Sequence, residues 1–171
     1  MIMLLKVDRI SSEYDIKLPK LINRTKRKIA FLSVVGDYNK LDYIACWAKM
    51  WAFINEKKLF GMRMEFLGIY YDDPRKVAAE ECRFEACVTI NKEAEDGQEI
   101  KIKEIEGGKY LMFHYTGSHD KLREVHNVIY NEYLIDKDYK LRNSPLIEKY
   151  LNNAEKVEPK KLRTEIYIPI D

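Results

Sequence analysis

Two glutamates occupy matching positions in two similar segments, one in each half of the chain. Glu85 lies in Arg-Phe-Glu-Ala-Cys-Val-Thr-Ile, and Glu165 lies 80 residues later in Arg-Thr-Glu-Ile-Tyr-Ile-Pro-Ile. Alternate residues of a strand face opposite sides, so Glu165 shares a face with Tyr167. Both glutamates are therefore candidate functional groups of a cleft between the two halves; the alternative is that they are exposed carboxylates balanced by Arg83 and Arg163.

The other reactive residue types lack the spacing that their chemistry needs. The three histidines are five and seven residues apart, which is not a standard zinc pattern. Cys46, Cys82 and Cys87 have no metal-ligand spacing and are typical of a reduced, cytoplasmic protein. Because Cys82 and Cys87 have opposite strand parity, we expect no disulfide between them. No serine or cysteine lies in a recognisable nucleophile elbow. The sequence predicts no metal and no cofactor.

Composition narrows the class of protein. The chain has 171 residues, of which 46% are hydrophobic and 34% charged, as in one globular domain with its own core. No apolar run approaches the roughly 20 residues that span a bilayer. The start, MIMLLKVDRI, lacks a small-residue cleavage site and is not predicted to be a signal peptide. A net charge of +2 is no nucleic-acid signature. We expect a cytoplasmic protein without a membrane partner.

An internal repeat organises the chain. Segments 28–36 (KIAFLSVVG) and 109–117 (KYLMFHYTG) are both β-rich and end in glycine, and Gly36 and Gly117 are 81 positions apart. Each glycine is followed by a short turn and then by Lys-Leu, which opens a helical pattern. Four such features in the same order, at offsets of 80 to 81, indicate two copies of one unit.

The repeated elements can be placed by periodicity. The first helix, about 40–57, is apolar on most of its circumference, so we expect it to be covered on two sides. The second, about 120–134, is a conventional amphipathic surface helix. The strands that follow the helices are expected at 65–71, 83–90, 145–151 and 163–170. The apolar strand faces, which we expect to lie under the helices, carry Phe84, Ala86, Val88 and Ile90 in one copy and Ile166, Ile168 and Ile170 in the other.

We therefore predict an α+β fold of tandem β-α-β-β repeats with pseudo-twofold symmetry. An antiparallel sheet has its helices on one side and a central ligand cleft, with Glu85 and Glu165 placed symmetrically about that cleft. The predicted divisions are a lead segment with a first strand at 1–27 and a ligand-binding domain at 28–171. Within this domain, repeat one is 28–90, the polar linker is 91–98 and repeat two is 99–171.

Short motifs along the chain match one known family in order. They are Val-Val-Gly-Asp-Tyr at 34–38, Trp47 and Trp51, Gly-Ile-Tyr-Tyr-Asp-Asp-Pro at 68–74, Arg-Phe-Glu-Ala-Cys-Val at 83–88, Gly-Gly-Lys-Tyr at 107–110, Tyr-Thr-Gly at 115–117, Glu-Lys-Tyr-Leu-Asn at 148–152 and Glu-Ile-Tyr-Ile-Pro-Ile at 165–170. With this set the chain resembles the GyrI-like small-molecule-binding domain, which also forms the effector-binding half of some AraC-type and MerR-type transcription regulators. The resemblance implies the tandem fold and an acidic residue in the closing strand that meets cationic, often aromatic, ligands. On the motif alignment that residue is Glu165.

Aromatic residues supply further ligand candidates. A ring face beside a cation contributes about 0.5–2 kcal/mol of attraction. The aromatic candidates are Tyr167, Trp51, Tyr71, Tyr115 and Tyr150, with core or rim packing as the alternative. Basic residues at 20–28 are a candidate contact for phosphate or an acidic partner, or else a solvated first strand.

Three classes of function follow. The first is non-enzymatic binding of small, cationic or amphipathic organic molecules by a stand-alone effector-binding module without a DNA-binding segment. The second is a protein-interaction module, such as a DNA gyrase inhibitor, with a protein partner. The third is a small-molecule hydrolase that uses a cleft carboxylate as its base. Because Glu165 is a possible base but no second catalytic group is evident, the sequence favours the binder.

Overall fold

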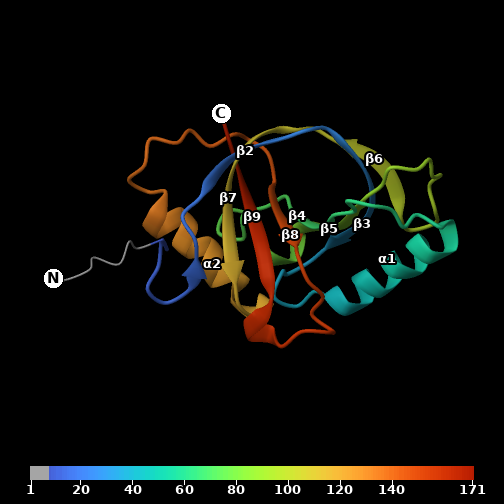
Figure 1. The fold of residues 1–171 in the computed structure, drawn as a ribbon, viewed down its shortest axis with the longest axis horizontal. Helices are drawn as coiled ribbons and strands as arrows, with labels where there is room; N and C mark the ends of the chain where they lie inside the picture. Colours follow the sequence, from blue (N-terminus) through green and yellow to red (C-terminus); the bar gives the residue numbers. More distant parts are fainter. Residues whose placement is uncertain (1–7) are drawn as a thin grey trace.

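The computed structural model describes residues 8–171 and shows one antiparallel sheet, curled into a half-barrel, with two helices (Figure 1). The strands are β1 (Asp15–Ile16), β2 (Lys20–Arg24), β3 (Arg27–Val35), β4 (Phe66–Tyr70), β5 (Arg83–Thr89), β6 (Lys101–Ile105), β7 (Gly108–Thr116), β8 (Leu146–Tyr150) and β9 (Arg163–Ile170). Their order is β1-β7-β9-β8-β4-β5-β3-β6, and β2 also pairs with β7. Most of the apolar start of the chain, which we predicted not to be a signal peptide, lies outside the described residues.

A bent two-stranded ribbon connects the two ends of this sheet. β2 continues into β3 after residues 25–26, and β6 continues into β7 after residues 106–107. β2 pairs with β7 and β3 pairs with β6, so the two bent strands run side by side along their length. β7 and β3 lie near opposite ends of the strand order, so the ribbon must arch from one end to the other. It is visible as the paired arcs at the top of Figure 1.

Two glycines allow the ribbon to bend. A Cβ on Gly107 would run into the backbone of Arg24 on the paired strand, and Gly108 has a φ of 152°. Only glycine tolerates both the close approach and this backbone conformation without strain. The Gly-Gly pair in the sequence therefore marks the bend that closes the half-barrel.

Helix α1 (Tyr43–Lys57) packs one side against the first half of the sheet. It begins later than the predicted residue 40 because Asp42 caps it, accepting a hydrogen bond from the Ala45 N–H at 3.0 Å. The expectation that this helix is covered on two sides is wrong, since Ile44 is 79% exposed. Within residues 8–171, no helix has the length and apolarity needed to cross a bilayer.

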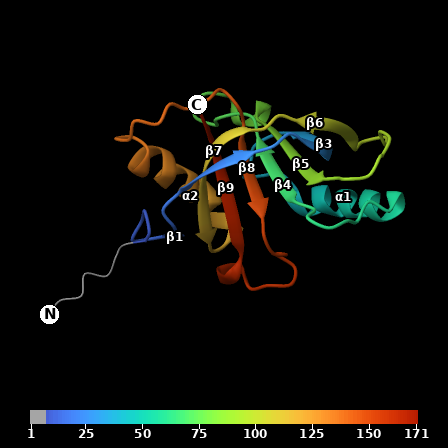
Figure 2. The same cartoon turned by 45° about the horizontal axis from the view of Figure 1, so that its top comes forward.

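Helix α2 (Leu122–Val128) covers the second half of the sheet and is shorter than the predicted segment 120–134. It is preceded by a 3₁₀ turn, His119–Lys121, and continued by a π-helical turn, Ile129–Tyr133. The predicted helical stretch is thus present but is built from three kinds of helical turn. Figure 2 shows α1 and α2 flanking the sheet, with β4 and β8 between them.

Both faces of the sheet are buried. The predicted apolar face lies under the helices in two clusters, with Phe84, Ala86, Val88 and Ile90 near α1 and Ile166, Ile168 and Ile170 near α2. A third cluster fills the other face and consists of Ile29, Leu67, Ile69, Cys87, Tyr110, Ile147 and Tyr167. Ile22 and Ile105 of the ribbon pack against it. The face without helices is therefore the interior of the half-barrel, which we call the inner face; we call the opposite one the helix face.

The sheet differs from expectation at one strand and agrees with it at another. Strand β6 (Lys101–Ile105) was not predicted; it pairs with β3 just after the predicted linker. Its sequence, Lys-Ile-Lys-Glu-Ile, is short and mostly charged, so its periodicity is a weak signal. The basic stretch at 20–28 includes β2, in agreement with a first strand in the lead segment. Strands β3, β4, β5, β7, β8 and β9 lie within one residue of their predicted limits, and no limits were predicted for the short strand β1.

The cysteines give a direct test of this packing. All three are unpaired and buried, and burial raises the pKa of the Cys87 thiol well above its ordinary value. We expect iodoacetamide to modify the native protein slowly and to alkylate three thiols after unfolding without a reductant, as counted by mass spectrometry. Recovery of a single alkylated thiol from the unfolded sample would reveal a disulfide and contradict the structure.

Candidate ligand-binding site

The predicted ligand-binding residues lie on both faces of the sheet. Glu85, Tyr71, Glu165 and Tyr167 belong to the inner face. Trp51, Tyr115 and Tyr150 lie on the helix face. The structure therefore brings the two glutamates to one face but separates them from three of the aromatic candidates.

Glu85 is held by a lysine and a tyrosine. Lys103 Nζ lies 2.7 Å from both carboxylate oxygens, the Tyr71 hydroxyl donates to Oε1 at 2.5 Å, and Ser33 donates to Oε2 at 3.3 Å. These residues line an open hollow of about 270 Å³ together with Arg83. A ligand cation in this hollow would have to compete with Lys103 for a carboxylate that is already neutralised.

Glu165 has similar partners at the other end of the inner face. The Tyr167 hydroxyl donates to it at 2.8 Å and Lys149 Nζ lies 3.7 Å away. Lys149 also pairs with Glu65 at 3.1 Å, and Glu65 in turn accepts from Arg24 at 2.8 Å. Glu165 thus belongs to a charged network that lysine and arginine already balance.

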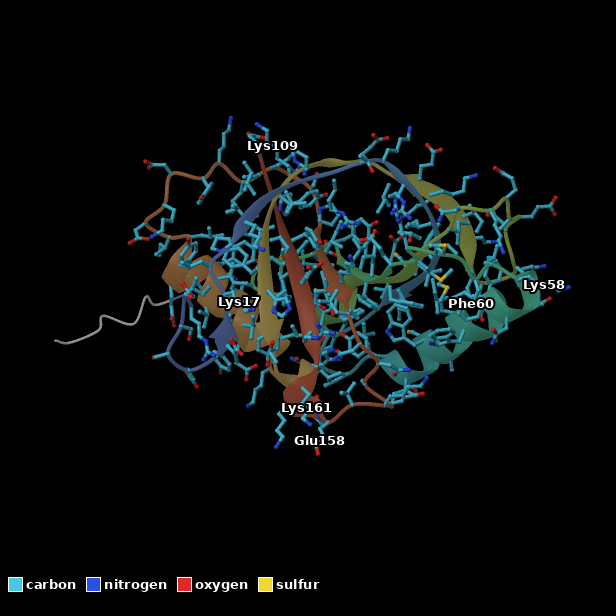
Figure 3. All side chains as sticks on the ribbon, in the orientation of Figure 1. Lys17, Lys58, Phe60, Lys109, Glu158 and Lys161 are labelled. Carbon is cyan, nitrogen blue, oxygen red and sulfur yellow. The ribbon has the colours of Figure 1, made fainter. Side chains whose placement is uncertain are left out.

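Two of the aromatic candidates have structural partners. The Tyr115 side chain is buried in the cluster under α2, and its hydroxyl donates to the Ser118 carbonyl at 2.9 Å. Trp51 stacks on Phe66 with ring centroids 5.1 Å apart and contacts Phe60 at 5.4 Å. Phe60, labelled in Figure 3, lies beside the C-terminal end of α1. Trp51 therefore lies at the rim of the helix face.

The helix face contains a buried glutamate that the sequence analysis did not single out. Glu148 of β8 is 0% exposed, although it carries an ionisable group. Its carboxylate lies 2.7 Å from His126 Nε2 of α2 and accepts a hydrogen bond from the Tyr150 hydroxyl at 2.8 Å. A buried charge is tolerated only where such partners satisfy it.

Aromatic rings surround this carboxylate. The Tyr70 and His126 rings lie edge to face with their centroids 6.0 Å apart, and the Trp47 and Tyr150 rings lie edge to face with their centroids 5.8 Å apart. The His119 ring also lies beside Tyr150, with a centroid distance of 5.4 Å. The rings come from β4, β8, α1, α2 and the turn before α2, so the site lies where the two halves of the protein meet.

A glycine makes room for these rings. Gly68 of β4 is the register partner of Glu148, and a Cβ at this position would overlap the Tyr150 hydroxyl and press on Phe84. Because Gly68 has no side chain, the Tyr150 ring can lie across β4 and reach the carboxylate. Gly68 and Glu148 are 80 residues apart, which is the offset of the repeat predicted from the sequence.

The protonation of the site follows from burial and its hydrogen bonds. Burial acts to raise the pKa of Glu148, but the hydrogen bond and charge of His126 outweigh it, with help from Tyr150 and Tyr70. The pKa of Glu148 therefore lies below its ordinary value, and the group is ionised at neutral pH. Burial, then the charge of Glu148, raises the pKa of Tyr70 and Tyr150 well above the ordinary value, so both keep their protons.

Only a weak sequence signal marks Glu148. In a strand over 145–151, Glu148 shares its face with Leu146 and Tyr150, whereas Ile147 and Lys149 lie on the other. A carboxylate between two apolar residues of one face is a useful sign when that face is known to be buried. Because each face of this strand carries one charged and at least one apolar residue, the pattern alone does not show which face the helices cover.

The comparison with known families identifies the class of protein as a small-molecule-binding domain. Residues 19–171 match the family described as GyrI-like small molecule binding domain, and the chain belongs to this family. The resemblance deduced from the motifs is thereby confirmed.

Relatives in this family carry two kinds of name. A protein named "Probable transcriptional regulator YgiV" from Escherichia coli K12 is 29% identical over 104 residues, or 60% of this chain and 65% of the relative. This chain therefore covers slightly less than two thirds of that relative's length. A protein named "DNA gyrase inhibitor" from Escherichia fergusonii is 30% identical over 151 residues, or 83% of this chain and 88% of the relative.

Solved structures share the fold. The EcmrR C-terminal domain superposes with a TM-score of 0.70 at 16% identity, covering 92% of this chain and 98% of that one. The protein SAV2435, solved with bound tetraphenylphosphonium, superposes with a TM-score of 0.62 at 16% identity, covering 90% and 93%. At these identities the likeness establishes the common architecture.

Removal of the histidine tests the buried charge. His126→Ala leaves the Glu148 carboxylate with tyrosine hydroxyls alone, so we expect the free energy of unfolding to fall by about 3 kcal/mol at pH 7. In the wild type the lowered pKa of Glu148 gives stability that is present above the ordinary glutamate pKa, about 4.3, and is lost as the pH falls through the folded value. In the variant burial dominates and raises the pKa of Glu148, so this contribution reverses and stability falls as the pH rises.

Urea denaturation at pH 5 and pH 8 measures both effects. His126→Gln, which keeps a donor without the charge, should lose less stability than His126→Ala. Equal stability of the wild type and His126→Ala at pH 8 would show that the carboxylate is not held as a buried charge.

Proposed function

We propose that this protein binds small organic cations, amphipathic in character, with Glu148 as the anionic group of the site. The observation that supports this most strongly is a fully buried carboxylate whose partners are a histidine and tyrosines. Glu85 and Glu165, in contrast, each have a lysine at their carboxylate. A ligand cation gains most where the protein leaves an anion without a permanent positive partner.

The surroundings of Glu148 suit a cation with an apolar body. Ring faces attract cations, and the attraction is larger where water is excluded. Trp47, Tyr70 and Tyr150 provide such rings within one site. Because Glu148 is enclosed in this structure, a ligand reaches it by displacing covering side chains. His126, 21% exposed, is a covering group that already contacts solvent.

The pseudo-twofold relation predicted from the repeat also belongs to this proposal. The strand order β4-β5-β3 in one half has the counterpart β8-β9-β7 in the other. The Gly36 N–H donates to the Cys82 carbonyl at 2.9 Å, and the Gly117 N–H donates to the Leu162 carbonyl at 2.8 Å. On this view the pseudo-twofold axis passes between β4 and β8, and the Glu148 carboxylate beside the axis binds one ligand.

Glu165 and Tyr167, favoured by the sequence, remain a second candidate site on the inner face. There the ligand would have to displace Lys149 from Glu165. The two candidate sites can be distinguished by experiment, because the same Glu→Gln substitution can be made at Glu148 and at Glu165.

The central prediction concerns charge-selective binding. Glu148→Gln keeps the volume of the side chain and removes its charge, so we expect tetraphenylphosphonium to bind about 10- to 100-fold more weakly. Triphenylphosphine oxide, a neutral molecule of related shape, should change by less than about threefold. Isothermal titration calorimetry on the wild type and the variant measures both.

Glu165→Gln is the matched control, since it is the same substitution at a carboxylate that lysine already balances. It should change the affinity for either molecule little. A large loss with Glu165→Gln and none with Glu148→Gln would instead place the site on the inner face, and equal losses for the cation and the neutral molecule would refute charge-selective binding.

Inhibition of DNA gyrase is a second candidate function, favoured by the 30% identity to a protein of that name over 83% of this chain. If this chain shares the activity, addition of the purified protein should slow gyrase-catalysed supercoiling of relaxed plasmid in proportion to the amount added. Agarose gels resolve the topoisomers. Unchanged supercoiling at a molar excess over gyrase would remove this candidate without affecting the ligand proposal.

A further inference from the structure

The Glu148 carboxylate has a cation in contact with it whenever His126 carries a second proton. The 2.7 Å contact between His126 Nε2 and the Glu148 carboxylate then joins a full positive and a full negative charge. An organic cation placed beside the same carboxylate would leave one unbalanced positive charge in a buried site. Such a charge is costly, because the interior solvates it poorly.

The other titratable groups around the pair do not change this charge balance. Tyr150 on β8, Tyr70 on β4 and Tyr43 on α1 have raised pKa values, chiefly because they are buried, and stay neutral. His119, in the turn before α2, has a pKa lowered chiefly by burial and is neutral as well. Among the described groups that surround the pair, His126 is therefore the one that can gain or lose a charge near neutral pH.

We propose that His126 fills the cation subsite with its own proton, and that a ligand cation binds in exchange for that proton. This inference rests on the proposed function and names how the same site selects and regulates its ligand. His126 is thus a specificity-determining residue: it holds the buried carboxylate ionised without a ligand and then yields the charge to one that carries its own.

The exchange balances in charge and atoms. The nitrogen that does not face Glu148, Nδ1, gives its proton to water, while Nε2–H remains a donor to the carboxylate. The ligand brings one positive charge as the proton takes one away, so the net charge of the site is the same before and after. The ring is 21% exposed whereas the carboxylate is 0% exposed, so the proton leaves from the member of the pair that already reaches solvent.

Two consequences can be measured. Binding of a permanent cation should release up to one proton, and more at pH 6 than at pH 8. The affinity should rise with pH, by at most tenfold per unit, and then level off. A permanently charged probe is needed so that the ligand itself does not titrate.

The test is calorimetric titration of the wild type with tetraphenylphosphonium at pH 6 in phosphate and in Bis-Tris, two buffers of different ionisation enthalpy, and again at pH 8. The difference in observed heat between the buffers gives the number of protons released. In His126→Gln, whose amide still donates to Glu148 and so favours its ionised form, we expect no release and equal affinity at both pH values. His114→Gln, the same substitution on the inner face, should behave as the wild type does, and circular dichroism checks that both variants fold.

The outcomes distinguish this inference from the function on which it rests. Proton release by the wild type that disappears in His126→Gln supports the exchange. Binding by the wild type without proton release overturns the exchange and leaves the proposed function standing, even if the variant does not fold. Release that persists in folded His126→Gln also overturns it. Absence of binding by the wild type at pH 8 overturns the proposed function, and the exchange with it.

Discussion

The bent ribbon formed by β2–β3 and β6–β7 is the constraint on which the rest of the structure depends. By linking the two ends of the sheet it encloses one face, so that the side chains of that face must satisfy one another. The carboxylates there are accordingly paired with lysine and arginine from neighbouring strands and from the ribbon itself. The helix face is left for a different kind of chemistry, in which one carboxylate is buried among aromatic rings.

The protein can bury the Glu148 carboxylate because its partners are a histidine, whose charge can change, and tyrosines, which donate hydrogen bonds without a charge. A lysine at the same place would neutralise Glu148 permanently, and an apolar residue would remove the reason for a cation to bind. A histidine can pair with the anion as a cation in the ligand-free protein and can lose its positive charge when a cationic ligand binds. Tyrosine hydroxyls add hydrogen bonds to the charged form without adding charge, while their rings exclude water.

The limits of most strands and the faces of the closing strands could be predicted because each rests on a local period of two. Which side of α1 is covered could not be predicted. Ile44 lies on an apolar stripe that faces solvent, and no pattern within the helix distinguishes this stripe from the buried stripe. Glu148 was missed for a related reason: Glu85 and Glu165 occupy matching positions in two similar segments, whereas Glu148 stands opposite a glycine. A search for likeness between the two segments therefore passes over it.

The ribbon also sets the order in which the chain can fold. Arg24 is paired with Gly108 and Lys20 with Met112, so the first strands of the lead segment find their partners only after the whole first repeat has been made. Contacts this distant in sequence are slow to form, because a long loop must close before they contribute. During synthesis the inner face of residues 28–90 therefore stays open until β7 emerges and pairs with β2.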